Sequence, residues 1–421
     1  MLRKMLKISG FSLLILVMLL FLIASPPRFL APLIQPVRTL LVSVAAGMVS
    51  RSLHGTLEID RVEGSFLSAP VARGISLKDA QGKQLVYLDT LSLRYRFADL
   101  VQGRLQIQEL IIRRPQLWLA WNEQGQLNLT DVFSQASTDH KVVATEADAR
   151  ISIVLEHVVV RNGSIDLVFP SLPGARNIDA LSLDLSGKLD EDGLKLELQH
   201  GTAQVKPAGV TVETLQGALS IAAERVQFGT WLLKSDASEI SLNGEIPGGS
   251  HPASLQLDLA PLDMGEIGRM FGEEALQGEI RGSVQAEGLA DALELDGRFS
   301  TGVSELLISG VRKTQGNVSN YQGTVQLAKL DLSELVARDA LRSDINAKLQ
   351  WRWGGLSQQN LDHDLELVIG ASRIGDVVIQ PSEVSVTVES ERVKVQRFEL
   401  QTSAFSAALE GEIDLGGPSA L

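Results

Sequence analysis

One pattern constrains this chain more than any other: from about residue 55 onward, apolar and polar residues alternate with a period of two. Successive side chains of a β-strand point to opposite faces, so the alternation predicts strands with one apolar and one polar face. Turn sequences such as DEDG (190–193) separate the runs. We therefore expect a mainly β protein of about 20–25 antiparallel strands. Clear examples of the alternation are LVYLDTLSLRYRF (85–97), LSLDLSG (181–187), LKLELQ (194–199), LQLDLA (255–260) and LEGEIDL (409–415).

A glycine motif recurs along these runs. The stretch LQGEIRGSV (276–284) holds two overlapping copies of apolar-x-Gly-x-apolar, which occurs eleven times in the chain. Eleven copies cannot be eleven phosphate-binding loops. The spacing puts the glycine and both apolar residues on one face of a strand, where a glycine permits a bulge or bend. We expect Leu276, Ile280 and Val284 on the apolar face of a strand containing Gly278 and Gly282.

A curved sheet with one continuous apolar face must close, pack on itself or hold something apolar. The fold that we favour is a long curved antiparallel β-sheet that forms an open, taco-like hydrophobic groove. The alternative is a β-sandwich array, in which a second sheet covers each apolar face. The candidate groove-lining residues are Leu105, Ile107, Leu117, Leu119, Leu181, Leu183, Leu185, Leu194, Leu196, Leu198, Leu255, Leu257, Leu259, Leu276, Ile280 and Val284.

The N-terminus predicts a membrane anchor. Basic residues Arg3, Lys4 and Lys7 precede an uncharged apolar run at 8–25, which as a helix would span about 27 Å. The run is longer than the core of a cleaved signal peptide, and its exit carries two prolines. The positive-inside rule leaves the tail in the cytoplasm and the bulk outside the inner membrane, which is the periplasm in a bacterium. The anchor candidates are Ile8, Phe11, Leu14, Leu16, Leu20 and Ile23.

The chain divides into five segments. We expect a tail and anchor helix at 1–28, an amphipathic helix within 29–52, a first β region at 53–133, a polar flexible insert at 134–149 and a continuing β region at 150–421. The amphipathic helix either lies on the membrane surface or caps the sheet. A second, short helix is predicted at 262–271, with Asp263 as its N-cap and Ile267, Met270 and Phe271 facing inward.

No catalytic constellation is visible in the sequence. The six histidines are isolated, cysteine is absent, and no nucleophile elbow, Walker loop or dinucleotide fingerprint occurs. We therefore expect no catalytic residue, metal or cofactor. The net charge of −13 argues against a nucleic-acid partner. Four tryptophans, Trp118, Trp121, Trp351 and Trp353, stand in two pairs that either pack in the core or face a ligand.

The order of these features resembles the AsmA-like superfamily, and within it the TamB-like family of inner-membrane subunits of translocation and assembly modules. The anchor, the region 53–133 with LQIQELIIRRPQLWLAW (105–121) and GQLNLTDVF (125–133), and the repeated L-x-G-x-I phrase carry the resemblance. It implies a hydrophobic β-groove rooted in the bacterial inner membrane that conducts phospholipids or other acyl-chain ligands between the two membranes.

The resemblance also implies a second role and a partner. TamB-like proteins support outer-membrane biogenesis and protein secretion with an outer-membrane Omp85-type barrel (TamA-like). Because such chains are much longer, we expect this chain to be an N-terminal portion, with the barrel-contacting part absent. The alternative function is therefore an assembly factor for outer-membrane or autotransporter proteins, whose strand edges pair with incoming strands.

Overall fold

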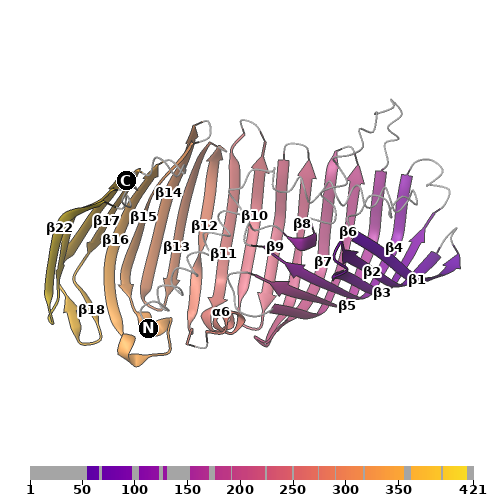
Figure 1. Ribbon diagram of the computed structural model, residues 1–421, viewed down its shortest axis with the longest axis horizontal. Helices are drawn as coiled ribbons and strands as arrows, with labels where there is room; N and C mark the ends of the chain where they lie inside the picture. The colour runs from indigo at the N-terminus through magenta and orange to yellow at the C-terminus, as the bar shows by residue number, and fades with distance from the viewer. Residues whose placement is uncertain are drawn as a thin grey trace, which may run out of the picture.

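The computed structural model describes residues 55–65, 69–96, 104–122, 127–129, 152–169, 176–190, 192–222, 225–248, 251–273, 275–289, 291–315, 318–354, 362–389 and 392–414. Within these ranges the chain forms one open sheet of 22 strands (Figure 1). The strand count falls within the predicted range, and the mainly β fold class is confirmed.

The strands and helices have the following bounds. The first eleven strands are β1 (Gly55–Ser65), β2 (Ala69–Asp79), β3 (Gln84–Tyr95), β4 (Arg104–Ala120), β5 (Ser152–Val168), β6 (Arg176–Asp190), β7 (Gly193–Lys206), β8 (Val210–Ala222), β9 (Arg225–Ser235), β10 (Glu239–Pro247) and β11 (Ala253–Asp263). After helix α6 (Met264–Phe271) come β12 (Glu279–Leu289), β13 (Ala292–Thr301), β14 (Ser304–Gln315), β15 (Val318–Leu330) and the 3₁₀ turns η3 (Leu332–Glu334) and η4 (Asp339–Leu341). The remaining strands are β16 (Ser343–Gly354), β17 (Asp362–Ile369), β18 (Ser372–Ile374), β19 (Val377–Ile379), β20 (Ser382–Glu389), β21 (Arg392–Gln401) and β22 (Ser406–Asp414).

The strands pair in sequence order, as a meander does. Each strand from β1 to β16 pairs with the next, β17 then pairs with β20, and the ladder continues through β21 to β22. The short β18–β19 hairpin branches from β16. One pairing departs from the expected antiparallel pattern, since β4 and β5 run parallel. A parallel pair needs a crossover connection, and the predicted polar insert at 134–149 falls within that connection.

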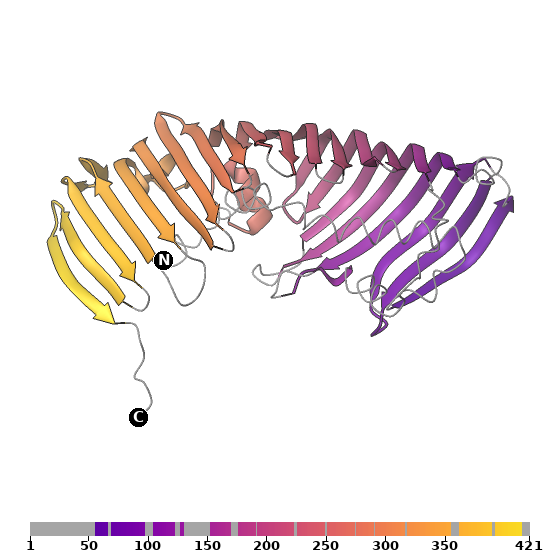
Figure 2. The same cartoon turned by 90° about the horizontal axis from the view of Figure 1, so that it is seen from above.

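The sheet is curved along its whole length. Figure 2 shows it as an arch whose two ends bend to the same side, with α6 on the inner side of the arch. The described strands form one sheet rather than two packed sheets, so the sandwich alternative does not describe this part of the chain. Within the same ranges no helix is long and apolar enough to cross a membrane. The predicted anchor (1–28, with Ile8, Phe11, Leu14, Leu16, Leu20 and Ile23), the amphipathic helix (29–52) and the insert (134–149) lie outside the described residues.

Helix α6 follows β11 in the middle of the ladder and packs against β7 and β8. Asp263 caps it as predicted, by accepting a hydrogen bond from the backbone N–H of Glu266 at 2.7 Å. Glu266 is buried, and its carboxylate accepts bonds from Ser235 Oγ at 2.6 Å and from the Ala237 N–H at 2.9 Å. The buried face of α6 differs in part from the prediction. Met264, Glu266 and Gly268 are the buried residues, whereas Ile267, Met270 and Phe271 were expected to face inward. Met270 packs as expected, against Val205, Ala208 and Val210.

A crease crosses the first strands of the sheet. Gly74, Arg114, Asn162 and Ala180 all have positive φ, between 47° and 62°, in β2, β4, β5 and β6. A residue in this conformation interrupts the alternation of side chains between the two faces. Two apolar residues on either side of it can therefore share a face although they are three positions apart in the sequence. In Figure 1 the indigo and purple strands accordingly change direction along their length.

The recurrent glycines divide into two kinds. Gly244 has a φ of 135° and lies at a register shift between β10 and β9, where a Cβ would stand 2.1 Å from the carbonyl oxygen of Ser254. Gly411, in the same sequence motif, has no atom of the described residues within 4 Å of such a Cβ. The predicted bend is therefore present at some copies only. The prediction that Gly278 lies inside a strand is wrong, because β12 begins at Glu279. The backbone of Gly278 approaches the Glu334 carbonyl, and Leu276 forms an isolated bridge with Val336.

Gly244→Ala should destabilise the protein by about 1–3 kcal/mol, because it places a Cβ against backbone in a conformation that alanine avoids. Gly411→Ala is the matched control and should change the free energy of unfolding by less than about 1 kcal/mol. Thermal unfolding followed by circular dichroism measures both. Equal losses for the two variants would contradict the assignment of the bulge to Gly244.

The crease should also make stability depend on pH. Arg114 donates a hydrogen bond of 2.9 Å to Asp89, and this bond, with one from Thr90, holds the pKa of the Asp89 carboxyl below its usual value. A lowered folded-state pKa gives stability that is present above the unfolded pKa of about 3.9 and is lost as the pH falls through the folded value. The melting temperature of Asp89→Asn should thus lie below that of wild type at pH 6–7, and the gap should shrink below about pH 4. Arg114→Gln should behave alike, whereas a gap of the same size at pH 3 and pH 7 would refute the role of this bond.

Candidate functional site

The most extensive feature of the described strands is an unbroken apolar row. Directly opposed residues of neighbouring strands point to the same face, so register partners can be followed from strand to strand. One such path, row A, runs from β3 to β22 and contains only apolar residues, glycines and one tyrosine. Row A consists of Tyr95, Ile107, Leu155, Gly187, Leu196, Leu219, Phe228, Gly244, Leu255, Ala286, Leu295, Gly310, Gly323, Trp351, Leu365, Val386, Val395 and Gly411.

Two further rows lie beside row A on the same face, nearer to α6. Row B consists of Leu242, Leu257, Val284, Gly297, Ile308, Val325, Leu349, Leu367, Val384, Phe398 and Leu409. Row C consists of Ile240, Leu259, Gly282, Phe299, Leu306, Leu327, Ala347 and Ile369. Together the three rows make a continuous apolar surface, here called the apolar face.

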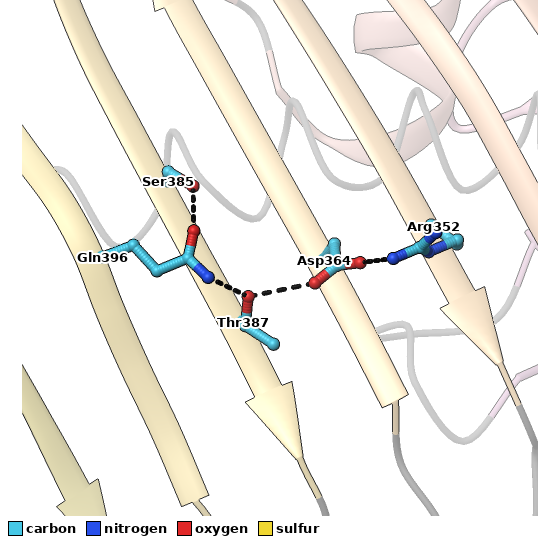
Figure 3. A network of polar contacts seen from close by, with 5 residues as sticks. All are labelled: Arg352, Asp364, Ser385, Thr387 and Gln396. Atoms are coloured by element: carbon cyan, nitrogen blue, oxygen red, sulfur yellow. Dashed lines mark hydrogen bonds and ion pairs between the residues drawn. The ribbon is translucent and has the colours of Figure 1, made fainter.

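The opposite face is polar along an equally continuous path. Beside row A, one residue away on β10 to β20 and two on β21, lie Asn243, Gln256, Gln285, Asp296, Ser309, Thr324, Gln350, Glu366, Ser385 and Arg397. Figure 3 shows a network on this face that joins four strands, in which Arg352 pairs with Asp364 and Thr387 donates to Asp364 at 3.0 Å. Gln396 then links Thr387 to Ser385. Along these two paths the faces of the sheet thus differ in polarity.

Charged side chains on the polar face pair with one another. Partial burial opposes ionisation of Asp364, but hydrogen bonds from Arg352 and Thr387 outweigh it and lower the pKa. A shallow hollow of about 580 Å³ on this face is lined by Glu294, Asp296, Asp364 and Glu366 among others. Nowhere in the described ranges do three or more His, Cys, Asp or Glu side chains gather in a way that could hold a metal ion.

Burial on the apolar face falls toward the C-terminal edge. Leu255 and Leu257, in the middle of the sheet, are 2% and 3% exposed, whereas Leu409 on β22 is 58% exposed. Val284, Phe299 and Ile308 belong to the same buried cluster as Leu257. The apolar face is therefore sequestered from water in the centre and accessible at the β22 edge.

Six of the sixteen candidate lining residues lie in rows A to C. Ile107, Leu196 and Leu255 belong to row A, Leu257 and Val284 to row B, and Leu259 to row C. The other predicted residues lie on strands of the same sheet: Leu105 on β4 pairs with Ile153, Leu117 and Leu119 lie on β4, Leu181, Leu183 and Leu185 on β6, Leu194 and Leu198 on β7, and Ile280 on β12. Leu276 is the exception, since it lies outside the strands.

The sequence prediction missed part of the apolar face. Phe228, Leu349, Trp351, Val384 and Phe398 lie in rows A and B but were not among the predicted lining residues. The alternation around each of them was the available signal. Trp351 lies on the apolar face with its ring centroid 6.4 Å from that of Trp353, while Trp121 stacks on Phe169 at 4.6 Å. Trp121, Trp351 and Trp353 therefore pack with other aromatic rings.

Comparison of the chain with family models, with curated proteins and with solved structures returns no match. The interpretation of the apolar face therefore depends on its geometry alone. That geometry offers a long apolar surface with a polar reverse side, which can bind apolar matter along its length.

Ile308→Asp should unfold or strongly destabilise the protein, by at least about 3 kcal/mol, because Ile308 is only 8% exposed and the new carboxylate would lack a partner. The adjacent Leu307→Asp is the matched control. Leu307 lies on the polar face opposite Arg298, so its replacement should cost less than about 1 kcal/mol. Chemical denaturation gives both values, and equal losses would show that the two faces do not differ in burial as described.

Proposed function

We propose that the apolar face binds lipid acyl chains and conducts phospholipids along the sheet between the inner and outer membranes. The single observation that carries the proposal is row A, which runs through eighteen strands without a formally charged residue. Transfer of each CH₂ group from water to such a surface is favourable by about 0.8 kcal/mol. A uniformly apolar lining has no deep minimum, so a chain can slide along it.

The sheet is large enough to act over a distance. Twenty strands stand side by side in the main ladder, with β18 and β19 to one side. At about 4.8 Å per strand this ladder extends on the order of 90 Å. The inner side of the arch carries α6, whose Met270 packs on apolar side chains of β7 and β8, which supports a concave, groove-like apolar face (Figure 2).

The proposal agrees with the resemblance to the AsmA-like superfamily and its TamB-like family. In this reading the N-terminal apolar segment anchors the chain in a bacterial inner membrane and the sheet stands in the periplasm. The protein is then a conduit without enzymatic chemistry.

A second function, in the assembly of outer-membrane proteins with an Omp85-type (TamA-like) barrel, draws support from the edge strand β22. Among the described strands, β22 pairs with β21 alone. Leu409 within β22 and Phe405 just before it are both exposed. An open edge of this kind can pair with an incoming strand. Photo-crosslinkers placed in β22 would capture polypeptide if this function holds, whereas crosslinkers at Leu367 would capture lipid if the first holds.

Leu367→Asp should reduce lipid binding several-fold, because it places a charge in row B, where Leu367 is only half-buried and the carboxylate can stay hydrated. Val368→Asp is the matched control: Val368 is the next residue, 40% exposed and on the polar face. Mass spectrometry of the lipids that co-purify with the full chain gives the molar ratio of lipid to protein.

The control variant should carry as much lipid as wild type, and both variants should keep the wild-type circular dichroism spectrum. If wild type carries no lipid, or if a folded Leu367→Asp protein carries the full amount, the conduit proposal fails.

A further inference from the structure

Three connections in series shape the rim of the sheet on the α6 side. Helix α6 joins β11 to β12, the η3 and η4 turns join β15 to β16, and the β18–β19 hairpin stands between β17 and β20. In Figure 1 both α6 and β18 lie at the lower edge of the sheet. On the opposite rim, the connections β12–β13, β14–β15 and β20–β21 are two residues long. Elements that restrain the ends of the strands are therefore concentrated on one rim.

The first connection is locked by a buried acid. Ser238, only 5% exposed, accepts the N–H of Asp263 at 2.9 Å and donates its hydroxyl to Glu266 at 2.5 Å. Further along α6, Arg269 donates to the carbonyl of Ala208 in the β7–β8 turn at 3.2 Å. These bonds fasten the rim from β7 to β11. Because the carboxylate is shielded from water, opening the lock would leave charged and polar groups without partners.

The second connection repeats this lock in sequence and in contacts. The segment 327–335 (LAKLDLSEL) matches 259–267 (LAPLDMGEI) at its two leucines, its alanine, its aspartate and its glutamate. Ser304, 2% exposed, accepts the N–H of Asp331 at 3.1 Å and donates its hydroxyl to Glu334 at 3.2 Å. The same serine, aspartate and glutamate thus meet in the same way on both connections, and the two arrangements are here called the acid locks.

The third connection has the serine but not the acid. Ser382 begins β20 and is followed by a glutamate and an aliphatic residue, as are the serines of the acid locks. Its hydroxyl accepts the N–H of Gln401 at 3.3 Å but donates to the carbonyl of Gln380 at 2.8 Å. The position three residues after Gln401, where the acid locks carry glutamate, holds the exposed Ala404. The buried carboxylate that fastens the other two connections is therefore replaced here.

The β18–β19 hairpin is instead fastened to the β21–β22 turn at the surface. The bonds that join them run from the Gln380 N–H to the Gln401 carbonyl at 2.8 Å, from the Ser403 N–H to the Val378 carbonyl at 2.8 Å, and from the Val378 N–H to Ser403 Oγ at 3.1 Å. Val378 is 41% exposed and Phe405 in the turn is 55% exposed. Exposed backbone hydrogen bonds with little buried apolar surface mark a segment that opens locally.

The hairpin stands beside the accessible end of the apolar face. On its other side β18 pairs with β16 through Ser343 and Ile374. The hairpin therefore spans the rim ends of β17 and β20, which stand between β16 and β21 in the ladder. Row B crosses these strands at Leu367, Val384 and Phe398. Without the hairpin contact, this stretch of rim would be held by the ladder alone.

We propose that the β18–β19 hairpin is a releasable strap: when it detaches from the β21–β22 turn, the C-terminal end of the apolar face opens and a phospholipid enters or leaves there. The acid locks keep the rim closed along the central strands. The proposal rests on the proposed function and names the place where cargo is exchanged. The burial of row B agrees with it, since Leu257 is 3% exposed between the acid locks and Leu409 is 58% exposed beyond the strap.

The test locks the strap with a disulfide. The chain has no cysteine, so an introduced pair has no competitor. Val378→Cys with Ser403→Cys joins two residues that already exchange hydrogen bonds, at the separation of a cross-strand pair, which suits a disulfide. The matched control is Leu276→Cys with Val336→Cys, at an isolated bridge on the second, acid-locked connection. Both double variants tie two segments of the same rim.

The readout is the rate at which the full chain, held in nanodiscs of phosphatidylethanolamine and phosphatidylglycerol, takes up dansyl-labelled phosphatidylethanolamine from vesicles. Energy transfer from the tryptophans to the dansyl group follows the uptake. The oxidised Val378→Cys/Ser403→Cys protein should be slower than wild type by about fivefold or more, and reduction should restore the rate. The oxidised control should match wild type. Equal rates for the oxidised and reduced strap variant, or the same slowing in the control, would overturn the strap and leave the conduit standing.

Hydrogen exchange of wild type tests the strap without lipid. The amides of Gln380 and Ser403 should exchange at least about tenfold faster than those of Asp263 and Asp331, which the serines of the acid locks hold. Equally slow exchange at all four would overturn the strap even if lipid is taken up. No uptake by wild type would overturn the conduit, and with it the role of the strap in lipid exchange.

Discussion

The register between neighbouring strands is the constraint on which the rest of this structure depends. Side-chain direction alternates along a strand, so a slip of one residue in any ladder would turn that strand's aliphatics to the polar side. The chain avoids this although its ladders contain many register shifts. At each shift, such as that of Gly244 against β9, the extra residue is absorbed and the apolar partner on the next strand is recovered. Rows A, B and C exist because these shifts are compensated, and the curvature of the arch is produced at the same places.

Much of the fold follows from the sequence, because the alternation is strong and local. It predicts the strand class, a strand count within the expected range and the cap at Asp263. Other features depend on partners distant in the sequence. The positive φ of Arg114, Asn162 and Ala180 belongs to a crease that crosses four strands, and none of these residue types marks it in isolation. Gly278 was placed inside a strand because its motif is identical to that of Gly282, whereas its contact with Glu334 comes from 56 residues away. The parallel β4–β5 pair is likewise invisible in the strand sequences themselves.

The position of Arg312 is another feature that the sequence alone does not predict. In sequence it stands beside Lys313 in a run that looks like a solvated turn approach. Only the pairing with Leu293 and Tyr321 places it on the apolar face.

The pairing order has a consequence for length. In the main ladder each strand from β5 to β17 contacts the strand before it and the strand after it, and the substantial contacts in the described part follow this order. Stability in such an array is approximately a sum of nearest-neighbour terms. An antiparallel hairpin can therefore be added or removed as a unit: the flanking strands keep their direction, their faces and their register, and the array changes by about 9.6 Å per hairpin. The span of the sheet is thus an adjustable quantity on the C-terminal side of β5, set in two-strand increments by the number of hairpins that the gene encodes.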